Sequence, residues 1–158
     1  MKTNRFENGF SLAELLLVIA IIGIIAAMAI PDLMSSRRAA NEASALQSMR
    51  LINSAEHTYL STTGDGTTYG SKTELMNRNL IDSVLGGAAP KSGYLFTVNP
   101  NAGGPPTYWA YALPSSTSGI TQTGMRRFGI TEDGVLRADT DLTAPADETV
   151  VKNISPIK

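Results

Sequence analysis

A single carboxylate interrupts a long apolar run near the start of the chain. Within residues 10–30 every side chain is apolar or small except that of Glu14. A charge at the centre of a membrane helix costs roughly 2.5–3.5 kcal/mol on insertion scales, so it usually marks a functional contact. A cut after Gly9 would place a new amino terminus, that of Phe10, one helical turn from Glu14. Two opposite charges would then mark the end of an otherwise apolar helix, an arrangement that suits a subunit whose partner lies in apolar surroundings.

Residues suited to catalysis are sparse elsewhere. His57 is the only histidine, and the chain has no cysteine, which excludes disulfides and thiolate metal sites. A lone histidine gives a triad or a zinc site no second member, so a structural or surface role is expected for it. The glycines that flank Asp65 lack the lysine and the helix start of a phosphate-binding loop. The sequence therefore predicts a protein that is not an enzyme and that has no cofactor and no metal.

Acidic residues gather toward the C-terminus and leave two interpretations open. Glu132, Asp133, Asp139 and Asp141 could supply oxygen ligands to calcium. Their spacing is not that of an EF-hand loop, which needs a glycine and a distal glutamate at fixed positions. We favour a solvated acidic loop over a calcium site.

The overall charge gives no reason to expect nucleic acid as a partner. The chain has 158 residues and a formal net charge of −1, whereas phosphate backbones select basic surfaces. Arg126 and Arg127 would suit a solvated strand edge, where charges discourage aggregation. Tyr108, Trp109 and Tyr111 could form an adhesive or sugar-binding surface, but their alternation predicts that they divide between two faces of a strand. DNA binding is not expected.

The elements that position Glu14 begin with one long helix, expected from about residue 11 to about residue 60. After residue 30 the pattern becomes amphipathic, with apolar residues at three- and four-residue steps and charged residues such as Glu42 and Glu56 on other faces. Pro31 predicts a kink rather than an end. Gly23 also weakens a helix interior, so residues 23–31 are its least secure part. Local melting there and close packing of helices remain alternatives.

The rest of the chain predicts a small antiparallel sheet. Strands are expected at residues 93–98 and 108–113, and the Asp-Gly pair at 133–134 predicts a hairpin between residues 127–131 and 135–137. Ser71 and Glu74 fit a capping box that opens a short helix. Residues 139–158 are polar and are expected to be irregular. The predicted fold class is α+β, with the C-terminal half of the long helix packed on the sheet.

The amino-terminal residues carry a family resemblance. The run Gly9-Phe10-Ser11-Leu12-Ala13-Glu14-Leu15-Leu16, followed by an apolar stretch to Pro31, resembles the class III signal segment of type IV pilins and type II secretion pseudopilins. The resemblance implies that a prepilin peptidase cuts between Gly9 and Phe10 and methylates Phe10. It also implies that Glu14 pairs with the terminal amine of a neighbouring subunit, and that residues 23–31 can lose helicity on assembly.

The resemblance divides the chain into a leader (1–9), a transmembrane and polymerisation helix (10–30) and a globular pilin domain (31–158). The last comprises an amphipathic half-helix (31–60), a loop (61–92), antiparallel strands (93–138) and the tail (139–158), which together make a pilin roll. The basic leader predicts a cytoplasmic amino terminus. The implied partners are identical or homologous subunits, the peptidase, an inner-membrane assembly platform and membrane lipid before assembly. The location would be the bacterial inner membrane and then an extracellular pilus or periplasmic pseudopilus.

Several alternatives remain for the same segment. Ala27-Met28-Ala29 would pass as the cleavage site of a conventional signal peptide, and the apolar run is long enough for an uncleaved anchor, which would make the chain a membrane-tethered binding protein. Neither explains why Gly9, Phe10 and Glu14 occur together. A pilus subunit is favoured slightly over a pseudopilin, although the absence of cysteine is less usual among pilins.

Overall fold

The computed structural model describes residues 10–157; residues 1–9, the predicted leader, and residue 158 lie outside the described residues. The chain divides into two compact units, residues 1–36 and 37–158. The first helix, α1 (Leu12–Thr62), contributes residues to both. The other elements belong to the second unit and are α2 (Lys72–Asn77), α3 (Ser83–Gly86), β1 (Tyr94–Pro100), β2 (Tyr108–Pro114), β3 (Arg127–Thr131), β4 (Arg137–Asp139) and α4 (Glu148–Lys152).

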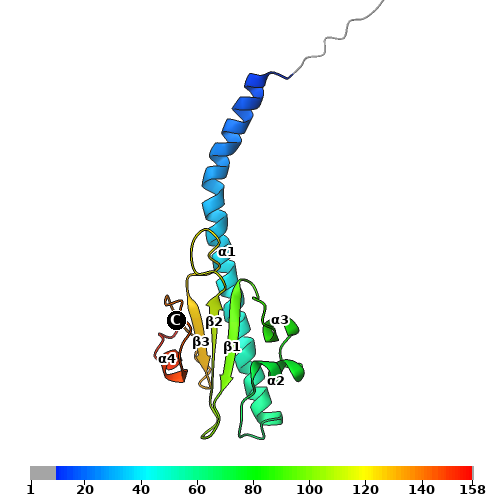
Figure 1. Ribbon diagram of the computed structural model, residues 1–158, viewed down its shortest axis with the longest axis vertical. Helices are drawn as coiled ribbons and strands as arrows, with labels where there is room; N and C mark the ends of the chain where they lie inside the picture. Colours follow the sequence, from blue (N-terminus) through cyan, green and yellow to red (C-terminus); the bar gives the residue numbers. More distant parts are fainter. Residues whose placement is uncertain (1–9, 158) are drawn as a thin grey trace, which may run out of the picture. The chain divides into compact units, whose positions relative to one another are not determined.

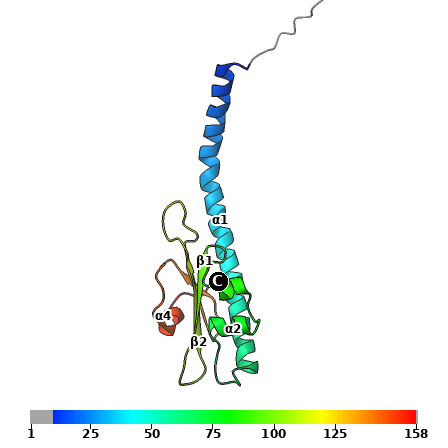
Figure 2. The same ribbon diagram turned by 45° about the vertical axis from the view of Figure 1, so that its right-hand side comes forward.

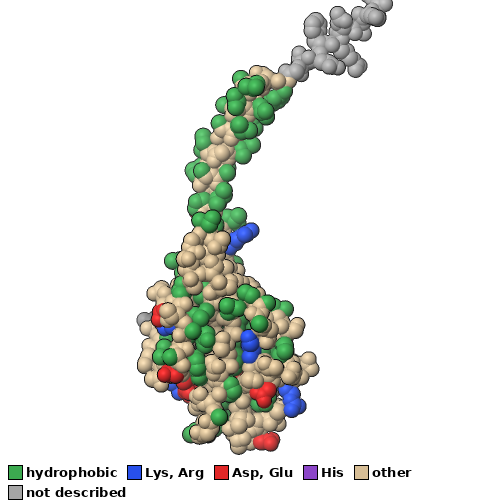
Figure 3. Space-filling view, in the orientation of Figure 1, with side chains coloured by type: hydrophobic (Ala, Val, Ile, Leu, Met, Phe, Trp, Pro, Cys, Tyr) green, Lys and Arg blue, Asp and Glu red, His purple; other side chains and the backbone are tan. Residues whose placement is uncertain are grey.

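The first unit consists of the apolar part of α1. Hydrophobic side chains cover the face of this segment that Figure 3 shows, and those of Leu12, Ile24 and Met28 are each more than half exposed. Such a surface requires lipid or neighbouring helices to cover it. Both Gly23 and Pro31 lie inside the helix. The predicted long helix is confirmed, while the kink at Pro31 stays a prediction.

The sheet of the second unit has four antiparallel strands in the order β1-β2-β3-β4 (Figure 1). Leu95 pairs with Leu113, Tyr111 with Gly129, and Gly129 with Arg137. All four strands overlap the predicted ones. The expected hairpin forms, but its second strand begins at Arg137 rather than at residue 135. Asp133 and Gly134 belong to a wider turn, in which Asp133 Oδ1 accepts from the Thr131 hydroxyl and from the Val135 backbone N–H.

One face of this sheet carries the hydrophobic core. Alternate strand residues point to this face, as the two-residue period of a strand requires, and they pack with one side of α1. The buried members include Tyr94, Phe96, Val98, Tyr108, Ala110, Ala112, Phe128 and Ile130 from the sheet and Ala45, Met49, Ile52 and Ala55 from α1. The amphipathic stripe predicted for the second half of the helix is thus the surface that the sheet covers.

Helix α4 lies on the opposite face of the sheet (Figure 2). The side chain of Val151 is fully buried there, above Gly129 of β3. A Cβ atom at position 129 would lie 2.7 Å from Val151 Cγ1, which is too close for any real contact. The bare glycine therefore allows α4 to approach the sheet.

The connection between α1 and β1 holds two short helices. The predicted capping box is confirmed at α2, where Ser71 and Glu74 exchange hydrogen bonds. Sequence reasoning missed α3, which Asp82 caps by accepting from the Leu85 backbone N–H at 2.6 Å. Lys72 donates to the Phe96 carbonyl of β1 at 2.9 Å, so a charged side chain blocks part of this edge strand.

The C-terminal segment is more ordered than predicted. It contains α4, and its last residues pair with β4 through the Ala138 N–H donating to Ser155 O at 3.1 Å and the Ile157 N–H donating to Leu136 O at 2.9 Å. The prediction of an irregular tail was wrong on this point. Its short helix escaped notice because only one side chain, Val151, is fully buried.

A buried arginine fastens the start of this segment. Arg127 of β3 is 5% exposed, and it donates to both carboxylate oxygens of Asp139 at 2.7 and 2.8 Å. It also donates to the Thr143 carbonyl at 2.8 Å. Bidentate pairs of this kind are among the stronger polar contacts in proteins.

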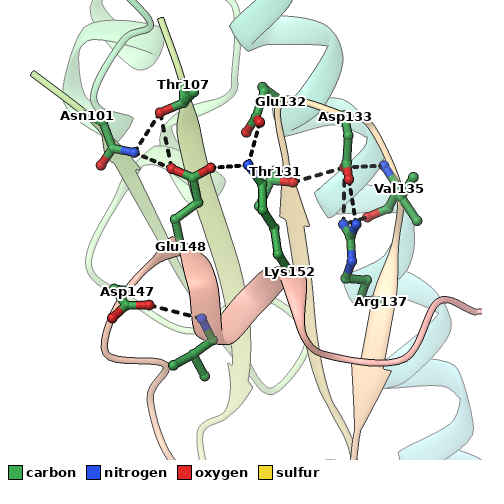
Figure 4. Close-up of polar contacts among 11 residues, drawn as sticks. Asn101, Thr107, Thr131, Glu132, Asp133, Val135, Arg137, Asp147, Glu148 and Lys152 are labelled. Atoms are coloured by element: carbon green, nitrogen blue, oxygen red, sulfur yellow. Dashed lines mark hydrogen bonds and ion pairs between the residues drawn. The ribbon is translucent and has the colours of Figure 1, made fainter. Parts of the chain in front are cut away.

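A second network fastens α4 itself (Figure 4). Lys152 pairs with Glu132 at 2.7 Å and with Glu148, and Glu148 also accepts from Asn101 and Thr107 of the β1–β2 connection. These two carboxylates raise the pKa of Lys152 to about 12. The two networks tie the C-terminal segment to the sheet in a chain that has no cysteine.

Arg127→Met should lower the free energy of unfolding by about 3 kcal/mol, because it removes three hydrogen bonds of a buried guanidinium, two of them to the Asp139 carboxylate. Lys91→Met is the control: Lys91 is 25% exposed and its partner Asp82 is 52% exposed, so the loss of this solvated pair should cost about 1 kcal/mol or less. Urea unfolding of the full chain in detergent micelles measures both. Equal losses would show that burial of Arg127 does not matter.

Candidate functional site

The carboxylate of Glu14 is bonded to its own helix start. Its Oε2 accepts from the Ser11 backbone N–H at 2.9 Å. The Ser11 hydroxyl in turn accepts from the Ala13 N–H at 3.3 Å, and the Leu15 N–H donates to the Ser11 carbonyl at 3.2 Å. Glu14 and Ser11 thus satisfy backbone groups that a helix start leaves without partners.

This arrangement leaves part of the carboxylate available. Among residues 10–157, Glu14 Oε1 accepts no hydrogen bond, whereas a carboxylate can accept several. Glu14 and Phe10 are both exposed, and the Phe10 side chain is 74% exposed. Gly9, the other residue of the predicted cleavage site, lies outside the described residues. The site can therefore accept a donor from another molecule without giving up its own cap.

The helix that carries Glu14 is long and apolar enough to cross a membrane, judged by length and composition only. It is the one helix of the described residues that meets these two criteria, and its mean hydropathy is 2.8 over its most apolar stretch. A signal sequence at an amino terminus would pass the same test. The helix continues through Gly23 and Pro31, and a Cβ atom at position 23 would meet nothing within 4 Å. Their role as the flexible part of the helix stays a prediction.

The acidic residues considered for calcium are engaged by basic side chains. Asp133 pairs with Arg137 at 2.5 Å, and this hydrogen-bonded contact lowers the pKa of Asp133 to about 2. Asp139 and Asp141 pair with Arg127, and Glu132 pairs with Lys152. Within residues 10–157 no group of three or more histidine, cysteine or acidic side chains is arranged to hold a metal ion.

The two arginines considered for DNA also have partners. Arg126 donates to Glu42 Oε2 through Nε at 2.9 Å and Nη2 at 2.8 Å, and its guanidinium lies 5.5 Å from the centre of the Phe128 ring. Arg127 is buried against Asp139. Both guanidinium groups are thus engaged by carboxylates, and the expectation that DNA is not a partner stays a prediction.

The aromatic residues divide between the two faces, as their alternation predicts. Tyr108 is fully buried and donates to Asn53 Oδ1 at 2.6 Å. Trp109 and Tyr111 lie on the other face, half-buried, with their rings stacked at 5.6 Å. His57 is exposed on α1 and meets Tyr69 edge-on at 6.0 Å.

Sequence reasoning misplaced one buried acid. Glu56 was assigned to the polar side of the helix, but its side chain is fully buried. The assignment was wrong because the residues that cover Glu56 come from the connection after α1, whose path the helical pattern does not contain. No signal in the sequence identifies it.

Comparisons with known proteins concern the amino-terminal segment. A family model described as the prokaryotic N-terminal methylation motif matches residues 4–30. The chain carries this methylation motif. The motif covers Gly9, Phe10 and Glu14 together with most of the apolar run.

A curated relative matches part of the chain. The type IV wide pilus major component PilA4 of Thermus thermophilus is 55% identical over 38 residues. The match covers 24% of this chain and 29% of the relative's length. No solved structure matches the chain.

Proposed function

We propose that this protein is a structural subunit of a type IV pilus-like filament. Its maturation would begin with cleavage between Gly9 and Phe10, followed by methylation of Phe10. The observation that carries it is the methylation motif at residues 4–30 around a carboxylate in an exposed apolar helix. The similarity to a pilus component supports a pilus or pseudopilus subunit, which is a structural rather than a catalytic role.

Polymerisation would transfer the apolar helix from lipid into a bundle of identical helices. Both surroundings are apolar, so this step changes little for Leu12 or Ile24. Glu14 is different, because an ionised carboxylate without a partner is costly in an apolar medium. A neighbour's Phe10 amine would neutralise Glu14 and fix the axial register of the two subunits.

The helix cap fits this pairing. Glu14 Oε2 already accepts from Ser11, and Oε1 remains to accept from the neighbour's amine. The carboxylate would then hold its orientation before a partner arrives, since its own chain restrains it. Pre-orientation of this kind lowers the entropy that association must overcome.

The proposed function also implies the path that the precursor takes from the membrane into the filament. The precursor would span the inner membrane once, with the prepilin peptidase acting on the cytoplasmic side, and an assembly platform would extract it into the filament. The remaining candidates are a type II secretion pseudopilin, which follows the same route, and a membrane-tethered binding protein that keeps its leader.

Mass spectrometry of the protein purified from its native membrane separates these classes. A filament subunit should begin at Phe10 and carry one added methyl group on its amine. A tether should retain Met1. An intact leader on the assembled or membrane-bound protein would contradict the proposal, while a methylated Phe10 would leave pilus and pseudopilus to be told apart by where the filament is found.

Two substitutions at Glu14 separate its charge from its capping role. Glu14→Gln keeps an acceptor for the Ser11 N–H but removes the charge, whereas Glu14→Val removes both. We expect both variants to insert and be cleaved, and both to reduce filament yield at least tenfold, measured by shearing and quantifying surface filaments.

Ser11→Ala is the matched control, because it removes the hydroxyl that caps Ala13 and leaves the Glu14 charge in place. We expect it to assemble nearly as well as the unmodified chain. Normal filament yield from Glu14→Gln would show that the cap, and not the charge, is what assembly requires.

A further inference from the structure

Glu56 is a buried acid without a basic partner. Its side chain is fully buried in the second unit, and Oε2 accepts from the Gly70 backbone N–H at 2.9 Å. Oε1 is also buried and has no hydrogen-bond partner among residues 10–157. An ionised carboxylate in this position would be a buried charge with one oxygen unpartnered, which costs more than a neutral acid in the same place.

No positive charge among residues 10–157 contributes to the pKa of Glu56. The charged group that acts on it is another carboxylate, that of Glu74 on α2. Glu56 itself acts electrostatically on phenols from three elements: Tyr59 on α1, Tyr69 in the following connection and Tyr108 on β2. Glu132 and Asp133 act on the same phenols, and Arg78 acts on Tyr59 and Glu74.

These conditions favour the protonated form. Burial raises the pKa of Glu56 to about 8 from an ordinary value of 4.5, against the opposing effect of the Gly70 hydrogen bond and with a further rise from Glu74. Near neutral pH the group is therefore a neutral acid in the native state.

The bond to Gly70 joins Glu56 to the connection that follows α1. The bond itself favours the ionised form, but closing the connection buries Glu56, and the larger cost of burying its charge then opposes closure. Residues 63–71 connect α1 to α2, and their first turns are held by backbone bonds to Tyr59 and Leu60. At the other end of the connection, the Gly70 backbone N–H donates to Glu56. Gly70 lies so near Tyr59 that a Cβ atom there would come within 3.0 Å of the ring. The connection therefore packs closely against α1 while Gly70 is bonded to Glu56.

We infer that Glu56 is a proton-dependent latch, which holds the connection 63–71 against α1 while it is protonated and releases it when the proton is lost. The latch depends on the packing of the second unit, and not on the proposed filament role. In the filament of the proposed function, where the second unit would meet the external medium, the latch would make this surface more mobile as the medium becomes alkaline.

The sign of the effect follows from linkage. The closed state binds the proton up to about pH 8, and the open state, in which Glu56 meets water, loses it near pH 4.5. Between these values the closed state binds more protons, so rising pH favours opening. The opening equilibrium constant should increase by about tenfold per pH unit from pH 5 to pH 7.5 and level off above pH 8.

Hydrogen exchange at the Gly70 amide tests the latch in the full chain in detergent micelles. After correction for intrinsic exchange, its protection factor should fall by about tenfold per pH unit from pH 5 to pH 7.5. In Glu56→Gln the amide oxygen still accepts from Gly70 but cannot ionise, so the protection factor should be independent of pH. The phenols do not interfere, because burial raises the pKa of Tyr59, Tyr69 and Tyr108 above that of an ordinary tyrosine.

Two controls address neighbouring groups. Glu74→Gln keeps a capping box and should retain the slope, as should His57→Gln, which removes the chain's one imidazole. A ¹³C titration of the Glu56 carboxyl in the unmodified chain needs no variant and should show a midpoint near pH 8. A midpoint below pH 6, a flat protection factor in the unmodified chain, or an unchanged slope in Glu56→Gln would each overturn the latch.

Discussion

An ionised carboxylate in apolar surroundings needs a partner that stabilises its charge. This constraint applies both to Glu14 in the first unit and to the acidic residues of the second unit. In the first unit Glu14 lies on an exposed apolar helix and satisfies one oxygen with the Ser11 N–H. The other oxygen can still accept a hydrogen bond from a second molecule. The proposed function rests on this contact, because apolar contacts alone would hold helices together in many registers.

The second unit meets the same constraint in two other ways. Along the C-terminal segment, carboxylates are matched with cations: Asp139 with Arg127, Asp133 with Arg137, and Glu148 with Lys152. These pairs fasten a segment that has no disulfide to hold it. Glu56 instead has no cation, and it avoids the cost of a buried charge by keeping its proton.

The sequence predicted the parts of the fold that repeat with a regular period. The long helix, the strands and the capping box at Ser71 follow from local patterns, and the structure has them within a few residues. It did not predict α3, α4 or the burial of Glu56. Each of these depends on contacts between distant segments, such as Val151 seated over Gly129 and Gly70 bonded to Glu56. The candidate site at Phe10 and Glu14 was found because a lone charge stands out against an apolar background, whereas Glu56 lies in a helix where charges are ordinary.

The pairing of subunits is tested most directly by a cryo-electron microscopy structure of the assembled filament at side-chain resolution. If subunits pair as proposed, the methylated amine of Phe10 lies within about 4 Å of the Glu14 carboxylate of an adjacent copy, the usual limit for an ion pair, throughout the helical array. A filament in which every Glu14 is distant from any neighbouring Phe10 amine, and satisfied by its own chain or by solvent, would contradict it.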